Sequence, residues 1–171
     1  MKVSILTSAY ILKYPSLPEA IESIAAVGYD EVDIAAWHPH AEPRLLGRKA
    51  RRELRDVIAS CGLRLNQIAT MGDPSSGLFA EMEAFVDGIR ERLDLAADLG
   101  ARCVEVLPGF TRPDLPRELT WKWAVDAYRR LSEHAEEVGV PLCLEFEPHQ
   151  PTQYLWGRPM PMNAYTLETF R

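Results

Sequence analysis

The sequence lacks any long apolar run. No stretch approaches the roughly 18 apolar residues that identify a membrane-spanning helix. The first residues, MKVSILTSAYILKYP, contain one lysine and one short apolar run. They lack the longer apolar region and the small-residue cleavage site of a secretory leader. We therefore expect no membrane partner and no export, which leaves a cytoplasmic location.

Cysteines are few and have no metal-like spacing. Cys61, Cys103 and Cys143 are odd in number, and none belongs to a CxxC pair. Each falls in an apolar, periodic segment, which is typical of a buried free thiol. A reducing compartment fits this pattern, in agreement with the predicted cytoplasmic location.

An excess of basic residues is also absent. Lysine and arginine total 19 against 25 aspartates and glutamates, so the net charge is −6. This balance argues against a nucleic-acid partner. Residues 47–61 do contain five basic residues, but an apolar stripe at helical spacing accompanies them, so we interpret them as a solvated helix face. They are Arg48, Lys49, Arg51, Arg52 and Arg55.

What the chain does contain is a regular alternation of strand-like and helix-like segments. With 171 residues and 47% hydrophobic content it has enough apolar material for one domain with a core. Helix-ending glycines, each followed within a few residues by an apolar run, recur with a nearly constant spacing of 34, 38 and 39 residues, at Gly28, Gly62, Gly100 and Gly139. The periodicity predicts strands over 3–10, 31–37, 63–70, 102–108 and from 140, with helices from 16 and over 47–61, 78–99 and 121–138.

Repeated βα units form either a doubly wound sheet or a (β/α)8 barrel. A nucleotide-binding doubly wound sheet has a glycine-rich loop after its first strand, whereas here that loop is Ser8-Ala9-Tyr10-Ile11-Leu12-Lys13. We therefore predict an α/β fold of the TIM-barrel class. A full barrel has about 250 residues, so residues 1–171 are expected to be one domain forming its N-terminal part, with five strands and four to five helices. If the protein ends at Arg171, two open sheet edges are expected to cause either self-association as a homo-oligomer or instability.

The segment from Val140 to His149 combines an apolar strand with acidic residues. Side chains alternate along a strand, so Cys143, Glu145 and Glu147 share one face and the leucines share the other. Parallel sheets are usually covered on both faces. A carboxylate near the end of such a strand therefore needs a metal, a cation or a substrate to offset its desolvation.

The same segment carries a family resemblance. LEFEPHQP resembles the fifth-strand motif of the xylose isomerase-like TIM-barrel superfamily, which includes sugar phosphate isomerases and epimerases and inosose dehydratases. GYDEVDIAAWHPHA resembles the second-strand segment of that superfamily. The resemblance implies that Glu145 is a ligand of a divalent metal (Mn²⁺, Mg²⁺, Co²⁺ or Zn²⁺) and a catalytic acid or base. The other ligands that it implies, an Asp, a His and a second Glu, come from strands six to eight.

Five further residues are implied as substrate-binding. Trp37, His38 and His40 match a substrate loop, in which Trp37 would be a wall for a sugar face. His38 and His40 also form an H-x-H pair that can ligate a metal, although spacing alone is a weak signal. His149 and the aromatic Tyr10 complete the set, and for a loop histidine such as His149 solvent exposure is an equal alternative.

Two more acidic residues lie within predicted strands. Asp33 takes the place of a glutamate that is common in the superfamily, and it either orients the site through hydrogen bonds or makes a plain buried contact. Glu105 lies between Val104 and Val106 and has no counterpart that we can assign in the superfamily.

The function implied is metal-dependent isomerisation or epimerisation of a sugar or cyclitol through an enediolate. The alternatives are a cyclitol dehydratase of the same superfamily and a truncated barrel fragment without activity. A DNA-repair endonuclease is a weaker alternative, because it requires zinc ligands at the ends of the third and fourth strands. The sequence has Thr70-Met71 and Pro108-Gly109 at these positions.

Overall fold

The computed structural model describes residues 2–75, 79–109, 115–145, 154–155 and 158–159. Within them, five parallel strands form one sheet in the order β1-β2-β3-β4-β5. The strands are β1 (Ser4–Leu6), β2 (Glu31–Ala35), β3 (Arg64–Ala69), β4 (Cys103–Val106) and β5 (Leu142–Leu144). The helices between them are α1 (Leu17–Val27), α2 (Arg48–Ser60), α3 (Phe79–Leu99) and α4 (Arg117–Val138). Two short antiparallel strands follow, β6 (Tyr154–Leu155) and β7 (Arg158–Pro159).

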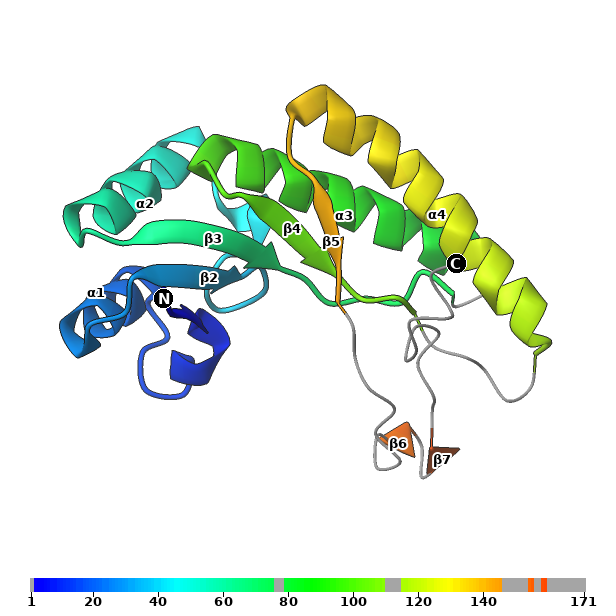
Figure 1. Cartoon of the computed structure of the whole chain (residues 1–171), viewed down its shortest axis with the longest axis horizontal. Helices are drawn as coiled ribbons and strands as arrows, with labels where there is room; N and C mark the ends of the chain where they lie inside the picture. Colours follow the sequence, from blue (N-terminus) through cyan, green and yellow to red (C-terminus); the bar gives the residue numbers. More distant parts are fainter. Residues whose placement is uncertain (1, 76–78, 110–114, 146–153, 156–157, 160–171) are drawn as a thin grey trace.

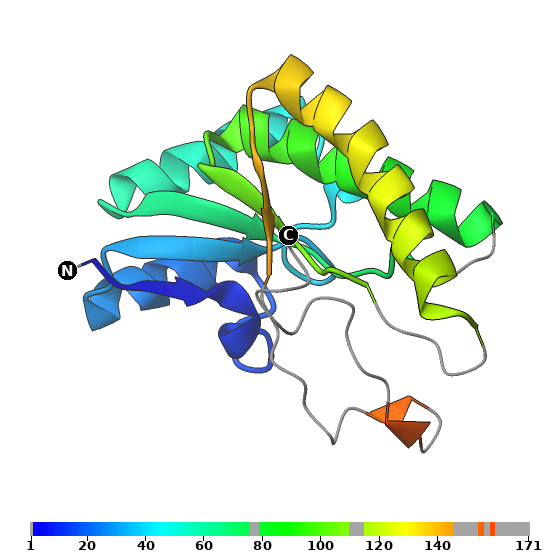
Figure 2. The same ribbon diagram turned by 45° about the vertical axis from the view of Figure 1, so that its right-hand side comes forward.

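Neighbouring strands in the sheet are also neighbours in the chain, and this distinguishes a barrel from a doubly wound sheet, whose strand order reverses. Figure 2 shows the strands side by side from dark blue (β1) to orange (β5), in a curved sheet. In Figure 1, α2, α3 and α4 lie along one side of this sheet. The predicted fold, part of a (β/α) barrel, is confirmed.

The core lies between the sheet and its helices. Ile34, Ile68 and Val104 from the three central strands are completely buried there, as are Ile21 of α1 and Leu131 of α4. Alternation along each strand directs these side chains to the convex, helix-covered face. Burial of this apolar surface is the main source of the stability of such a layer.

A bulge in β3 changes which side chains face the concave side. Val32 pairs with Leu65, but the next residue of β2, Asp33, pairs with Gln67, so β3 has one extra residue, Asn66. Leu65 and Ile68 are three residues apart and both belong to the helix-side core. The bulge therefore leaves two successive residues, Asn66 and Gln67, available to the concave face.

Two predicted boundaries differ from the structure by more than two residues. The strand predicted over 3–10 ends at Leu6, and Thr7–Tyr10 forms a 3₁₀ helix, η1. The buried Thr7 hydroxyl there accepts a hydrogen bond from the backbone N–H of Ala35 at 3.0 Å, which closes this end of β1 against β2. The last helix begins at Arg117 rather than 121, directly after Pro116 at its N-cap.

Two interpretations of side chains were incomplete or wrong. The Arg51 side chain is only 17% exposed and is not part of a simply solvated face. Its Nε donates to the carbonyl of Leu46 at 2.8 Å, and its Nη1 lies 2.7 Å from Asp98. The three cysteines are free thiols, as predicted, but none is fully buried. Cys61 and Cys103 are partly buried, and Cys143 is exposed because it lies on β5, the last strand of the described sheet. Among the described residues, no helix has the length and apolarity of a membrane span.

Candidate active site

Four polar side chains lie on the concave face, one from each of β2, β3, β4 and the end of β5. They are Asp33, Gln67, Glu105 and Glu145. In the sheet register Asp33 pairs with Gln67, and Glu105 pairs with Cys143. The backbone N–H of Glu145 donates to the carbonyl of Val106 at 2.9 Å, so Glu145 continues the β4–β5 ladder by one residue. It thus lies at the C-terminal end of β5, the end at which the active sites of (β/α)8 barrels are found.

Glu105 is the centre of this polar group. Its Oε2 accepts a hydrogen bond from Nε2 of Gln67 at 2.5 Å, and its carboxyl group is hydrogen-bonded to that of Glu145. Its backbone carbonyl accepts from the Thr70 hydroxyl at 2.8 Å. Glu105 is therefore held from β3 on one side and contacts the β5 glutamate on the other.

The environment of Glu105 favours its neutral form. Partial burial is the largest cause, followed by the hydrogen bond with Glu145 and the charge of Glu145; together these raise the pKa of Glu105 to about 8. The charge of Asp33 acts in the same direction, and the Gln67 hydrogen bond opposes it. Two carboxyl groups in contact share a hydrogen bond only when one of them carries a proton. The concave face thus holds a carboxyl pair in which one proton is retained near neutral pH.

Asp33 and two thiols flank the carboxyl pair. Oδ1 of Asp33 accepts hydrogen bonds from Ser4 Oγ at 2.7 Å and from Asn66 Nδ2 at 2.9 Å, so the β3 bulge supplies one of its donors. Cys103 is hydrogen-bonded to Cys143, and burial together with that contact raises the pKa of Cys103 to about 12. The Cys103 thiol is therefore protonated at neutral pH and is no thiolate nucleophile.

The aromatic and histidine residues predicted to bind substrate lie after β1 and β2. Tyr10 ends η1, and its ring stacks on that of Tyr14 with 6.2 Å between ring centroids. The His40 side chain is buried, and its Nε2 lies 2.8 Å from the carbonyl oxygen of Tyr14. Tyr10 and His40 thus meet at Tyr14, which joins the loop after β1 to the loop after β2.

The other three residues predicted to bind substrate are Trp37, His38 and His149. Trp37 is half-buried and His38 is exposed, both just after β2. His149 lies outside the described residues. The structure brings Tyr10 and His40 together at Tyr14, and it brings Glu145 to Glu105. The substrate-binding role of these five residues stays a prediction.

The sequence analysis did not predict that Glu105 and Gln67 contact each other beside Glu145. The signal for Glu105 was present, because Val104-Glu105-Val106 repeats the apolar-acidic-apolar pattern of Leu144-Glu145-Phe146 one βα unit earlier. Strand alternation then places both glutamates on the same face of neighbouring strands. Gln67 had no such signal, since its direction depends on the bulge at Asn66.

The oxygen atoms of Glu105 and Glu145 are of the kind that binds divalent metals. Carboxylate oxygens are ligands of Mg²⁺ and Mn²⁺, and they also bind Zn²⁺. In the parts of the chain that the structure describes, no three His, Cys, Asp or Glu side chains lie close enough to hold a metal ion. A metal ion at Glu145 would therefore need further donors from outside the described residues.

Comparisons with known proteins agree with the fold. A family model described as a xylose isomerase-like TIM barrel matches residues 21–169. A search of curated proteins gave no match. Among solved structures, 3-keto-D-glucoside 4-epimerase YcjR from E. coli is similar with a TM-score of 0.75 and 19% identity over 99% of this chain and 61% of that protein.

Two further structures are similar. D-psicose 3-epimerase from Clostridium cellulolyticum H10, solved with D-tagatose, has a TM-score of 0.69 and 19% identity over 87% of this chain and 53% of that protein. The IOLI protein, solved with a bound zinc atom, has a TM-score of 0.70 and 20% identity over 84% of this chain and 51% of that protein. This chain therefore spans between half and two thirds of the length of these proteins.

Proposed function

Because the chain belongs to the xylose isomerase-like TIM barrel family, we propose that the full-length protein is a sugar isomerase or epimerase that uses a divalent metal. The substrate class is a sugar or a cyclitol with a carbonyl next to a hydroxyl-bearing carbon. Glu145 is the central residue of this proposal, as a metal ligand and as an acid or base.

The observation that carries the proposal is the position of Glu145. It is a half-buried carboxyl group on the concave face of a barrel sheet, at the C-terminal end of β5, in contact with a second carboxyl group from β4. Proton transfer next to a carbonyl needs a general base, such as a carboxylate, placed close to the substrate carbon. The concave face of β4 and β5 offers such a group where barrel enzymes bind their substrates.

The other residues of the chain have supporting roles in this proposal. Trp37 and His38 line the end of β2 and would contact the sugar, and Tyr10 and His40 fix the neighbouring loop through Tyr14. Asp33, which accepts hydrogen bonds from Ser4 and Asn66, keeps the concave face polar on the β2 side of the carboxyl pair.

A divalent metal, when bound, would supply positive charge that stabilises the oxyanion formed as the proton leaves. Among the described residues Glu145 would hold it. The zinc atom in the IOLI protein and the sugar in the D-psicose 3-epimerase structure support this choice of metal and substrate class.

The proposal is tested with Glu145→Ala and Glu145→Gln in the full-length protein. Both variants remove the carboxylate, and we expect bound metal per protein, measured by elemental analysis, to fall to a small fraction of that in the unchanged protein. We expect epimerase turnover, measured with a panel of ketohexoses and inososes, to fall at least about 100-fold, as is usual when a catalytic acid or base is lost.

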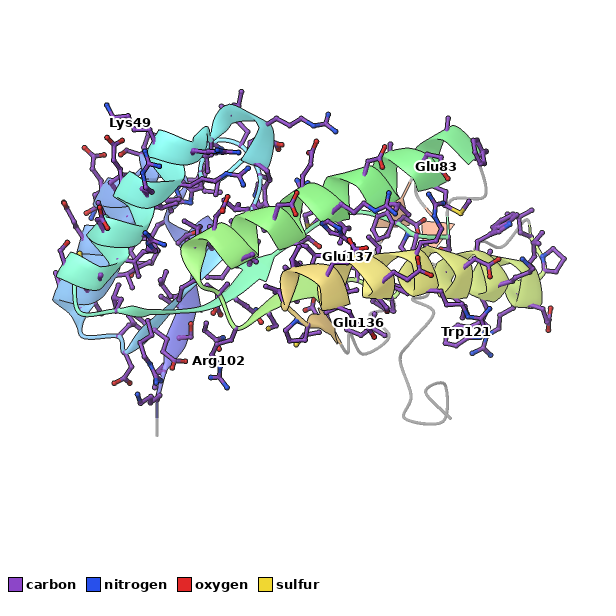
Figure 3. All side chains as sticks on the ribbon, turned by 90° about the horizontal axis from the view of Figure 1, so that it is seen from above. Lys49, Glu83, Arg102, Trp121, Glu136 and Glu137 are labelled. Carbon is purple, nitrogen blue, oxygen red and sulfur yellow. The ribbon has the colours of Figure 1, made fainter. Side chains whose placement is uncertain are left out.

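The matched control is Glu136→Gln. Glu136 is exposed on α4, on the helix side of the molecule (Figure 3), so its substitution removes the same charge away from the concave face. Metal content and turnover should stay unchanged in this variant. A Glu145→Ala protein that retained both would refute the proposed site.

A further inference from the structure

The side chain of Glu145 contacts Glu105, a neighbour that is held by two hydrogen bonds from β3 and the residue after it. Glu105 belongs to β4, which is hydrogen-bonded to β3 on one side and to β5 on the other. Its carboxyl group accepts from Gln67 at 2.5 Å, and its carbonyl accepts from Thr70 at 2.8 Å. Glu145 follows the last residue of β5, the edge strand of the described sheet.

The register gives the two carboxyl groups a fixed relation. Glu105 pairs with Cys143, and Glu145, directly after the last residue of β5, is the next residue on the same face. The two side chains are therefore diagonal neighbours on adjacent strands, within reach of the carboxyl–carboxyl hydrogen bond that contributes to the raised pKa of Glu105. A glutamate side chain has three rotatable bonds, so a hydrogen bond to a fixed partner removes most of the freedom of its carboxyl group.

We propose that Glu105, itself fixed by Gln67, is a positioning residue that holds the Glu145 carboxyl group in the orientation in which it binds metal. This inference rests on the proposed function of Glu145 as a ligand. Glu105 acts through the hydrogen bond between the two carboxyl groups. The chain of contacts runs Gln67, Glu105, Glu145, and it crosses three adjacent strands.

The shape of the contact predicts which substitutions are tolerated. In Glu105→Gln the amide N–H can donate to the Glu145 carboxylate while the amide oxygen still accepts from Gln67, so both hydrogen bonds are retained. In Glu105→Leu the volume is similar but both hydrogen bonds are lost. In Gln67→Leu the Glu105 carboxyl group remains and loses its donor.

The experiment is a titration of the metal-free, full-length protein and its variants with Mn²⁺, in which free Mn²⁺ is followed by electron paramagnetic resonance. We expect Glu105→Leu to weaken Mn²⁺ binding about 10- to 100-fold, the range measured for residues that orient metal ligands. Glu105→Gln should bind close to the unchanged protein, and Gln67→Leu should fall between the two. Unchanged Mn²⁺ binding in Glu105→Leu, with Glu145→Ala unable to bind, would overturn the positioning role alone.

The variants also distinguish a wrong metal site from a wrong positioning role. If Glu145→Ala binds Mn²⁺ as well as the unchanged protein, the proposed metal site is wrong, whatever Glu105 does. If circular dichroism shows that Glu105→Leu does not fold, Gln67→Leu decides, and Mn²⁺ binding equal to that of the unchanged protein would refute the inference. Equal loss of binding in Glu105→Gln and Glu105→Leu would also refute it, since the amide retains the contact.

Discussion

The two faces of this sheet differ in what their side chains do. On the convex face, Ile34, Ile68 and Val104 are completely buried under the helices. On the concave face, side chains of the same strands, Asp33 and Glu105, form hydrogen bonds with their neighbours. A single alternating sequence thus separates the residues that stabilise the sheet from those available for chemistry. Substitutions on the two faces should have correspondingly different effects.

The largest expected effect is on the convex face. Ile34→Ala removes a fully buried side chain at the centre of the sheet and leaves a cavity, and it should lower the free energy of unfolding by about 2–5 kcal/mol. The measurement is urea denaturation followed by circular dichroism.

The control for Ile34→Ala is Cys143→Ala on the concave side. Cys143 is exposed, so we expect its substitution to change the free energy of unfolding by less than about 1 kcal/mol. Equal losses in the two variants would mean that the two faces do not divide stability in this way.

A smaller effect is expected in the outer helix layer, at Arg51 of α2. Arg51→Ala removes a largely buried side chain that donates to Leu46 and pairs with Asp98, and should cost about 1.5–3 kcal/mol of unfolding free energy. Lys49, on the same helix (Figure 3), is the matched cation: its side chain is 83% exposed and lies 3.6 Å from Glu53. Lys49→Ala should cost no more than about 0.5 kcal/mol. Similar costs for both would show that Arg51 is as solvated as its neighbours.

The fold could be predicted because its signals are local and repeated. Apolar periodicity and helix-ending glycines, such as Gly28 and Gly139 with left-handed φ of 99° and 71°, recur in each unit, and the absence of glycine in the first loop excluded the nucleotide-binding alternative. The shortening of β1 could not be predicted, because it depends on the hydrogen bond between Thr7 and Ala35, residues 28 positions apart.

The candidate site could be predicted only in part for the same reason. Glu145 was predicted as a site residue from alternation along one strand together with a family motif, and its position at the end of β5 is compatible with that prediction. The partner of Glu145, Glu105, depends on the register of β4 and β5, and Gln67 depends on the β3 bulge. Neither contact between strands is encoded in a short stretch of sequence. The basic residues of 47–61 illustrate the same limit, since only tertiary contacts distinguish Arg51 from Lys49.

The carboxyl pair on the concave face should make the free energy of unfolding depend on pH. The pKa of Glu105 is raised from 4.5 to about 8 in the folded protein. Between these values the folded state retains a proton that the unfolded state has lost, so the stabilising contribution is fully present below pH 4.5 and is lost as the pH rises through about 8. Because Glu105 is only half-buried and solvent screens the shift, we expect a loss on the order of 1 kcal/mol over this range.

This loss can be isolated with Glu105→Gln, which has no proton to lose and still fills the site. Urea denaturation of the metal-free protein in a chelating buffer, between pH 5 and pH 8.5, should give a steeper fall in unfolding free energy for the unchanged protein than for the variant. Every other ionisable group is present in both proteins, so its contribution cancels in the difference between the two curves. Glu136→Gln, exposed on α4, should reproduce the curve of the unchanged protein. Parallel curves for the unchanged protein and Glu105→Gln would mean that the carboxyl pair on the concave face does not share a proton, and the polar face would then resemble ordinary solvated surface.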